Sequence, residues 1–232
     1  MKTMLIPSQN NIGANTANSP RRRELLLFFT GWGMDEHPFR AFLPAANDCL
    51  LCYDYKTLTF DAALLCGYDR VKVVAWSLGV WAAATVLPGC QLPPGDRIAV
   101  NGTHYPVDER RGIPLGIFQG TLNGLNEAAL AKFRRRMCGS REACERFLRA
   151  APRRGIDDLR EELRCLGDAA VHRPAPAFAW SHIFIGEQDR IFPAENQARA
   201  WEGGNIAFAT TPHYPENEWT RIFAMNRPDP QS

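Results

Sequence analysis

The chain has 232 residues, 45% of them hydrophobic, which suffices for one full core and an insertion. Its net charge of +2 shows no general bias toward nucleic acid, and no apolar run approaches the length of a membrane span, so we expect neither partner. The N-terminus lacks the charged-then-apolar order of a signal peptide. Residues 1–23 are predicted to be a disordered tail, because residues 8–20 are rich in Asn, Ser, Ala and Gly.

Short apolar runs alternate with helical patterns along most of the chain. Strands are expected near residues 25–30, 49–54, 71–76, 97–101, 181–185 and 205–209. Helices are expected near residues 35–46, 58–66, 78–87, 193–202 and 215–224. Asp35 is the expected N-cap of the first helix. This alternation is typical of an α/β fold with a mostly parallel sheet.

One segment has the pattern of a nucleophile elbow. Residues 71–79 read Val-Lys-Val-Val-Ala-Trp-Ser-Leu-Gly, a strand that ends at Ser77 and is followed by small and helix-forming residues. Such a turn lifts one serine clear of the backbone, and the serine becomes an effective nucleophile beside a base and an oxyanion site. The usual elbow is Gly-x-Ser-x-Gly, and here Ala75, the smallest replacement, takes the first glycine position.

The acid and the base of such a site follow the serine in chain order. Asp189 comes after the apolar stretch Ile183–Ile185, and His213 lies in the loop after the last predicted strand. Because the carboxyl ends of parallel strands share one rim, we expect Ser77, Asp189 and His213 to meet there. Taken singly, Asp189 has a simpler interpretation as a turn aspartate and His213 as a loop histidine. Their order favours a catalytic triad, with His213 as the base and Asp189 as its orienting partner.

The oxyanion site of such an enzyme needs two backbone N–H groups. One comes from the residue after the nucleophile, here Leu78. The other comes from the loop after an early strand, and residues 25–33 read Leu-Leu-Leu-Phe-Phe-Thr-Gly-Trp-Gly. Trp32, between two glycines, is the predicted second donor. Trp76 is interpreted as a packing residue.

Residues 104–176 interrupt the alternation of strands and helices. A Gly- and Pro-rich stretch (104–124) precedes three amphipathic helical stretches, the second capped by Ser140 and the third by Asp157. The sequence therefore predicts a helical cap over the rim. The core is then formed by residues 24–103 and 177–232, with the cap at residues 104–176.

Charge is unevenly distributed in the predicted cap. Residues 132–154 hold nine basic and two acidic side chains, a net of +7, which leaves −5 for the rest of the chain. An anionic partner is more plausible on this surface than a plain solvated face, and arginine suits carboxylate or phosphate groups. No base-stacking aromatic residues interleave with the arginines, so we do not expect nucleic acid. The candidate binding residues are Arg134, Arg135, Arg136, Arg141, Arg146 and Arg149.

The seven cysteines are an odd number and lie mostly in apolar context, which indicates reduced thiols and a cytoplasmic protein. Cys49 and Cys52 have the spacing of a zinc knuckle, but no second pair matches them, and the segment is typical of a strand. We expect no metal and no organic cofactor, because all the catalytic groups are in the chain. His37 and His104 are interpreted as structural or surface groups.

Four segments resemble the BioG-type pimeloyl-[acyl-carrier protein] methyl ester esterases, a family of biotin synthesis in the α/β-hydrolase superfamily. They are residues 27–35, 75–81, 101–103 and 186–193, and the resemblance spans about residues 24–225. The Gly-Trp-Gly and Trp-Ser-Leu-Gly-Val-Trp motifs are its specific parts. The resemblance implies an α/β-hydrolase fold with an inserted cap, the triad Ser77, Asp189 and His213, and the oxyanion donors Trp32 and Leu78.

The resemblance also implies a reaction. The chain would be a serine carboxylesterase that removes the methyl group from the far end of a pimeloyl chain on acyl carrier protein. The acidic carrier would meet the arginines of the cap. Two alternatives stay open: another esterase or acyl thioesterase of this fold with a basic lid, and a binding protein that has the fold without catalysis.

Overall fold

The fold is centred on a seven-stranded sheet with the strand order β1-β3-β2-β4-β5-β6-β7. This computed structural model describes residues 1–9 and 23–225. The strands are β1 (Lys2–Ile6), β2 (Glu24–Phe29), β3 (Asp48–Tyr53), β4 (Arg70–Trp76), β5 (Arg97–Val100), β6 (His182–Gly186) and β7 (Ile206–Ala209). Only the edge strand β1 is antiparallel to its neighbour, so the expected α/β fold with a mostly parallel sheet is confirmed.

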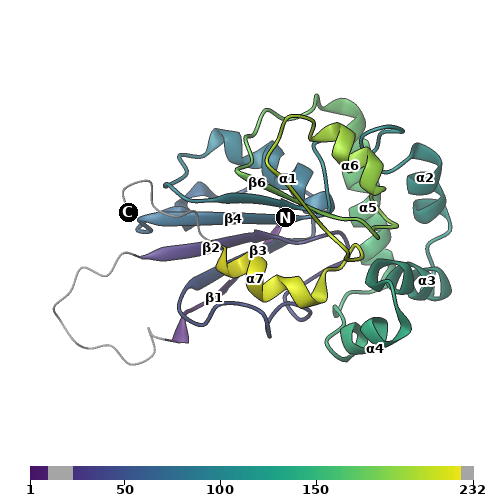
Figure 1. Cartoon of the computed structure of the whole chain (residues 1–232), viewed down its shortest axis with the longest axis horizontal. Helices are drawn as coiled ribbons and strands as arrows, with labels where there is room; N and C mark the ends of the chain where they lie inside the picture. Colours follow the sequence, from purple (N-terminus) through teal and green to yellow (C-terminus); the bar gives the residue numbers. More distant parts are fainter. Residues whose placement is uncertain (10–22, 226–232) are drawn as a thin grey trace.

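Helices cover both faces of the sheet and gather at one end of it (Figure 1). They are α1 (Leu78–Val86), α2 (Leu115–Asn123), α3 (Glu127–Cys138), α4 (Arg141–Arg149), α5 (Ile156–His172), α6 (Ala194–Ala200) and α7 (Trp219–Ala224). Short 3-10 turns lie at Ala62–Leu65, Leu87–Gly89 and Glu216–Glu218. The four helices α2–α5 follow β5 and precede β6, and Figure 1 shows them at the end of the sheet where the strands finish.

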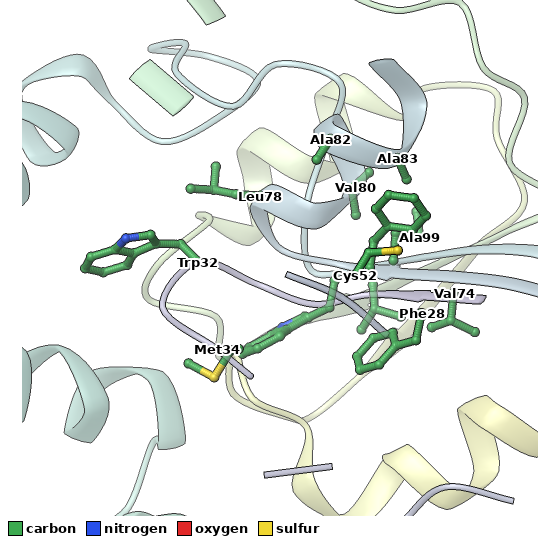
Figure 2. Packing of buried hydrophobic residues seen from close by; sticks show 14 of the residues in the cluster. Phe28, Trp32, Met34, Cys52, Val74, Leu78, Val80, Ala82, Ala83 and Ala99 are labelled. Atoms are coloured by element: carbon green, nitrogen blue, oxygen red, sulfur yellow. The ribbon is translucent and has the colours of Figure 1, made fainter. Parts of the chain in front are cut away.

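The core lies between the sheet and its covering helices. β2 is apolar at every position after Glu24, as expected for a parallel strand covered on both faces. The ring of Phe28 meets Phe39 edge-on at 4.8 Å between centroids and Phe223 of α7 at 5.1 Å. Small residues let α1 approach the sheet closely, and Figure 2 shows Ala82 and Ala83 among the buried side chains.

The N-terminal segment differs from the prediction. Residues 2–6, assigned to a disordered tail, form β1, in which Leu5 lies opposite Leu50 of β3. The pairing explains the error, because a five-residue edge strand is stabilised by its neighbour more than by its own composition. Residues 10–22 of the predicted tail lie outside the described residues.

Two predicted helices are absent. Residues 35–46 form successive turns, and Asp35 accepts a hydrogen bond from the backbone N–H of His37 instead of capping a helix. Residues 58–66 contain only the 3-10 turn Ala62–Leu65. The other core helices are found near the expected positions.

The segment between β5 and β6 holds one helix more than expected. α2 lies within the stretch 104–124, where Gly116 and Gly120 weaken the helical signal. Ser140 caps α4 as predicted, accepting a hydrogen bond from the N–H of Ala143. The N-cap predicted for the third helical stretch, Asp157, was wrong. The N-cap of α5 is Gly155, and Asp157 lies in the first turn of the helix. The division into core and cap at residues 104–176 stays a prediction.

All seven cysteines lie in the described part of the chain, and all are free thiols. Cys49 and Cys52 belong to β3, as expected. Among the helices that the structure describes, none combines the length and the apolar character needed to cross a membrane.

Candidate active site

Ser77 lies in a sharp turn between β4 and α1. Its backbone has φ 60° and ψ −131°, which few residues other than glycine adopt. Gly79 lets this turn pack against β2, since a Cβ there would lie 2.3 Å from the carbonyl oxygen of Thr30. Gly102 does the same from the β5 side, where a Cβ would lie 2.2 Å from the carbonyl oxygen of Ser77. Ala75 is fully buried in β4, so the first glycine of the usual elbow is not needed.

Replacing Gly79 with alanine is expected to lower the free energy of unfolding by about 1–3 kcal/mol, because the new methyl group meets rigid backbone. Gly89→Ala is the matched control, as nothing lies within 4 Å of a Cβ at that position. Urea denaturation of both variants checks the prediction, and equal stability of the two would contradict it.

A chain of hydrogen bonds joins Ser77, His213 and Asp189. Ser77 Oγ is 2.9 Å from His213 Nε2, and His213 Nδ1 is 2.8 Å from Asp189 Oδ2. The ionised carboxylate accepts only, so His213 Nδ1 carries the proton and Nε2 accepts from the serine hydroxyl. All three residues are buried, and the structure brings together the three side chains that the sequence predicts.

Both oxygens of Asp189 are fully engaged. Oδ1 accepts hydrogen bonds from the backbone N–H groups of Ile191 (2.8 Å) and Phe192 (2.9 Å). Oδ2 accepts from the amide of Gln197 at 2.9 Å in addition to His213. These donors hold a buried anion in one orientation. Gln197, on α6, was missed because nothing in the sequence near it indicates such a partner.

Two further residues hold the loop that carries His213. Asn101, at the end of β5, donates to the carbonyl oxygens of His213 (2.9 Å) and Pro212 (3.1 Å) and accepts from the N–H of Gly186 (2.7 Å). The indole N–H of Trp76 donates to the carbonyl oxygen of His213 at 2.8 Å. Trp76 therefore does more than pack, and the Asn-Gly pair after β5 was the available signal for Asn101.

The loop after β2, residues 30–35, is named here the β2 loop. Gly33 in it has φ +75°, a left-handed conformation that favours glycine. In the described part of the chain, the backbone N–H of Trp32 donates to no protein acceptor. Leu78 is the first residue of α1, where backbone N–H groups lack partners within the helix. Trp32 and Leu78 line the same cavity as Ser77, and Figure 2 shows both extending away from the sheet core.

This cavity is lined mainly by apolar side chains from the segment between β5 and β6. Ile117 and Phe118 come from α2, Phe133 and Met137 from α3. A second cavity shares Ile117, Phe133 and Arg136 with it and is also lined by Lys132. The shared residues belong to α2 and α3, so the two cavities adjoin there.

The predicted binding arginines differ in their surroundings. Arg146 pairs with Glu216 at 2.7 Å and Arg141 with Glu145 at 2.9 Å. Arg134 is half-buried between α3 and α4, and burial lowers the pKa of its guanidinium. Four of the six form no ion pair with a carboxylate among residues 1–9 and 23–225: Arg134, Arg135, Arg136 and Arg149.

His37 and His104 make structural contacts within the protein. His104 accepts a hydrogen bond from the indole N–H of Trp180 at 2.8 Å, and burial lowers the pKa of His104 to about 4. His37 lies beside Asp35 and Glu36. Each of the three residues has one atom that could bind a metal ion, and these atoms lie within 4.8 Å of one another. That group is held by protein donors, since Asp35 accepts from the N–H of Arg153 and Glu36 pairs with Arg40.

Comparison with known proteins identifies the family. The family model described as "Pimeloyl-ACP methyl esterase BioG" matches residues 15–221. A protein of Bacteroides fragilis named malonyl-[acyl-carrier protein] O-methyltransferase is 52% identical over 196 residues. That match covers 84% of this chain but only 40% of the relative's length.

Solved structures give the same result for the fold. The crystal structure of BioG from Haemophilus influenzae has a TM-score of 0.80 at 33% identity, over 95% of this chain and 97% of that one. A hydrolase from Pseudomonas aeruginosa has a TM-score of 0.60 at 14% identity, over 95% and 90% of the two chains. At that identity the likeness shows the fold alone, which is the α/β-hydrolase fold.

Proposed function

Because the chain belongs to the BioG family of α/β-hydrolases, we propose that it is a serine esterase that hydrolyses the methyl ester of pimeloyl-[acyl-carrier protein], in biotin biosynthesis. The products are pimeloyl-[acyl-carrier protein] and methanol. One observation carries the proposal: the buried hydrogen-bond chain from Ser77 through His213 to Asp189 opens into an apolar cavity.

In the proposed mechanism, Ser77 Oγ attacks the ester carbonyl carbon while His213 Nε2 takes the hydroxyl proton. The backbone N–H groups of Trp32 and Leu78 stabilise the negative charge that develops on the carbonyl oxygen. His213 then gives its proton to the departing methoxide, so methanol leaves. Water, activated by His213, hydrolyses the acyl-enzyme and restores Ser77. Asp189 stabilises the imidazolium at each step.

The shape of the cavity supports selectivity for the distal ester. A pimeloyl chain is apolar between its two ends, as are most of the side chains that α2 and α3 contribute. A carrier docked on the outside of α3 would feed the chain through the cavity that Lys132 and Arg136 line. The methyl ester then reaches Ser77 first, and the thioester at the other end stays away from it.

The name of the Bacteroides fragilis relative fits this scheme. An O-methyltransferase that acts on malonyl-[acyl-carrier protein] produces a carrier-bound methyl ester. The esterase proposed here removes such an ester. The relative is longer than the match, so its named activity is not assigned to this chain. A cytoplasmic location is part of the proposal and is supported by the free thiols.

Intact-protein mass spectrometry of methyl-pimeloyl-[acyl-carrier protein] tests the function. The enzyme is expected to lower the mass of the substrate by one CH2 unit and to leave the acyl chain on the carrier. Loss of the whole acyl chain would identify a thioesterase instead. An unchanged mass, with small esters still hydrolysed, would contradict the proposed substrate.

Charge reversal on the cap tests the carrier contact. The double variant Arg135→Glu, Arg149→Glu is expected to lower kcat/KM for the carrier-bound ester about 10-fold at low salt, because both side chains are exposed and unpaired. Hydrolysis of p-nitrophenyl esters should stay unchanged. Arg23→Glu, Arg70→Glu makes the same charge change at the amino ends of β2 and β4. Equal losses in the two double variants would contradict docking on the cap.

A further inference from the structure

We infer that Glu162 of α5 is a positioning residue that holds the β2 loop in the conformation that binds an oxyanion, and that Arg154 holds the Glu162 carboxylate in place. The inference rests on the proposed serine mechanism, because it assigns the orientation of the Trp32 N–H group to a residue outside the triad.

Glu162 is a fully buried carboxylate that the mechanism does not use. In the described residues its hydrogen bonds go to Gly33, Tyr55 and Arg154, and none goes to the triad. A buried carboxylate is costly unless it is paired and hydrogen-bonded. Burial raises the pKa of Glu162, and Arg154 and the two backbone donors oppose that rise. Its position is therefore governed by the groups it binds.

Two contacts of α5 hold the β2 loop, one at the Trp32 side chain and one at the backbone of Gly33. Glu162 Oε2 accepts from the N–H of Gly33 at 3.1 Å. One turn earlier, the carbonyl oxygen of Leu159 accepts from the indole N–H of Trp32 at 2.8 Å. Glycine is otherwise the most freely rotating residue, and Gly31 and Gly33 flank Trp32. These two bonds remove that freedom at Trp32, which lines the cavity beside Ser77.

Tyr55 carries the same constraint to the start of the loop. Its backbone N–H donates to Glu162 Oε1 at 3.0 Å, and its hydroxyl donates to the carbonyl oxygen of Thr30 at 2.7 Å. The Glu162 carboxylate thus binds both Tyr55, which anchors Thr30, and Gly33, which follows Trp32 in the loop. Loss of either acceptor would release one end of the loop.

Arg154 connects Glu162 to a partly buried ionic cluster. Its side chain is 5% exposed, and Nη1 lies 2.7 Å from Glu162 Oε2 and 3.4 Å from the carbonyl oxygen of Met34 in the β2 loop. The same guanidinium pairs with Asp158 at 2.7 Å and with Asp54 at 3.2 Å. Lys2 and Lys56 also pair with Asp54, so three cations balance three carboxylates. This pairing holds the Glu162 carboxylate in one orientation.

The experiment compares Glu162→Gln with Glu161→Gln in hydrolysis of a p-nitrophenyl ester. Glu161 is the exposed neighbour on α5, where its carboxylate pairs with Arg164 and accepts from the thiol of Cys165, so it makes the matched control. A glutamine amide cannot accept at both ends, so one of the two backbone N–H groups loses its acceptor. We expect kcat to fall about 10- to 100-fold in Glu162→Gln with little change in KM, as for a weakened oxyanion site.

A boronic acid separates a positioning role from general destabilisation. It forms a tetrahedral adduct with a serine, so its affinity should fall by the same factor as kcat/KM. A second variant, Arg154→Lys, keeps the positive charge but cannot reach all the partners of the guanidinium. We expect its kcat to fall about 3- to 10-fold. This variant tests the inference even if Glu162→Gln does not fold. Folded Glu162→Gln with unchanged kcat and boronate affinity would overturn the inference, as would a loss confined to KM.

The wild-type enzyme distinguishes this failure from failure of the proposed function. Normal wild-type hydrolysis beside an unaffected Glu162→Gln would remove the positioning role alone. A wild-type protein that is inert toward both the small ester and the carrier-bound ester would contradict the serine mechanism, and the positioning role with it.

Discussion

Replacing Ser77 with alanine is expected to lower kcat for ester hydrolysis by about 10⁴- to 10⁶-fold, because the nucleophile of the proposed triad is lost. Substrate binding should be retained, since the apolar cavity is intact. The same variant should no longer be labelled by a fluorophosphonate. Rates with the carrier-bound ester and with a p-nitrophenyl ester are the measurements.

Ser181→Ala is the control for this change. Ser181 lies at the start of β6, where its hydroxyl bonds to the backbone of Arg97, at the opposite end of the strand from the site. It should keep full activity. If Ser77→Ala retained wild-type turnover, the nucleophile would lie elsewhere; retained binding without turnover in the wild type would indicate a non-catalytic binding protein.

Replacing Asp189 with asparagine is expected to lower kcat about 10⁴-fold while leaving the fold intact. Each oxygen of Asp189 faces two donors, so an amide NH2 meets a donor in either orientation. With the NH2 toward His213, Nδ1 must accept, and the proton moves to Nε2, which can no longer take the proton of Ser77. The effect is on chemistry, so KM should change little.

The matched control is Asp168→Asn on the exposed side of α5, where the carboxylate pairs with Arg164. Both variants change the net charge equally. The thermal midpoint and the pH dependence of kcat for each are the measurements. Comparable activity in the two variants would show that the contact between Asp189 and His213 has no catalytic role.

The triad was predictable because each member directly follows a strand. Ser77, Asp189 and His213 come after β4, β6 and β7, and a parallel sheet brings the ends of its strands to one rim. The argument needs only the local sequence and the order of the motifs. The same reasoning placed Trp32 and Leu78 beside Ser77.

The supporting residues were not predictable in this way, because their contacts join distant segments. Asn101 bonds to His213 at a separation of 112 residues, and Glu162 bonds to Gly33 at 129. Glu162 did leave a signal in the sequence: it lies within the apolar stripe of Leu159, Leu163 and Leu166, where a charge must find a buried partner.

Secondary structure was misjudged where tertiary contacts decide it. α2 contains two glycines and is stabilised by packing, in which Phe118 lies against Gly167 of α5. Residues 35–46 were expected to form a helix. The Asp35 carboxylate instead accepts hydrogen bonds from the backbone N–H groups of His37 and Arg153, and the segment forms successive turns. In both places the local propensity was overridden by a residue distant in sequence.

The bonds between the β2 loop and α5 have a consequence for how such enzymes diversify. A chimaera that joined residues 24–103 and 177–225 to the helices of a different hydrolase would bury the N–H of Gly33 and the indole N–H of Trp32 without acceptors. Each orphaned donor costs about 1–3 kcal/mol. We therefore expect changes of substrate range to arise from substitutions in α2 and α3, and α5 and the β2 loop to be retained as a pair.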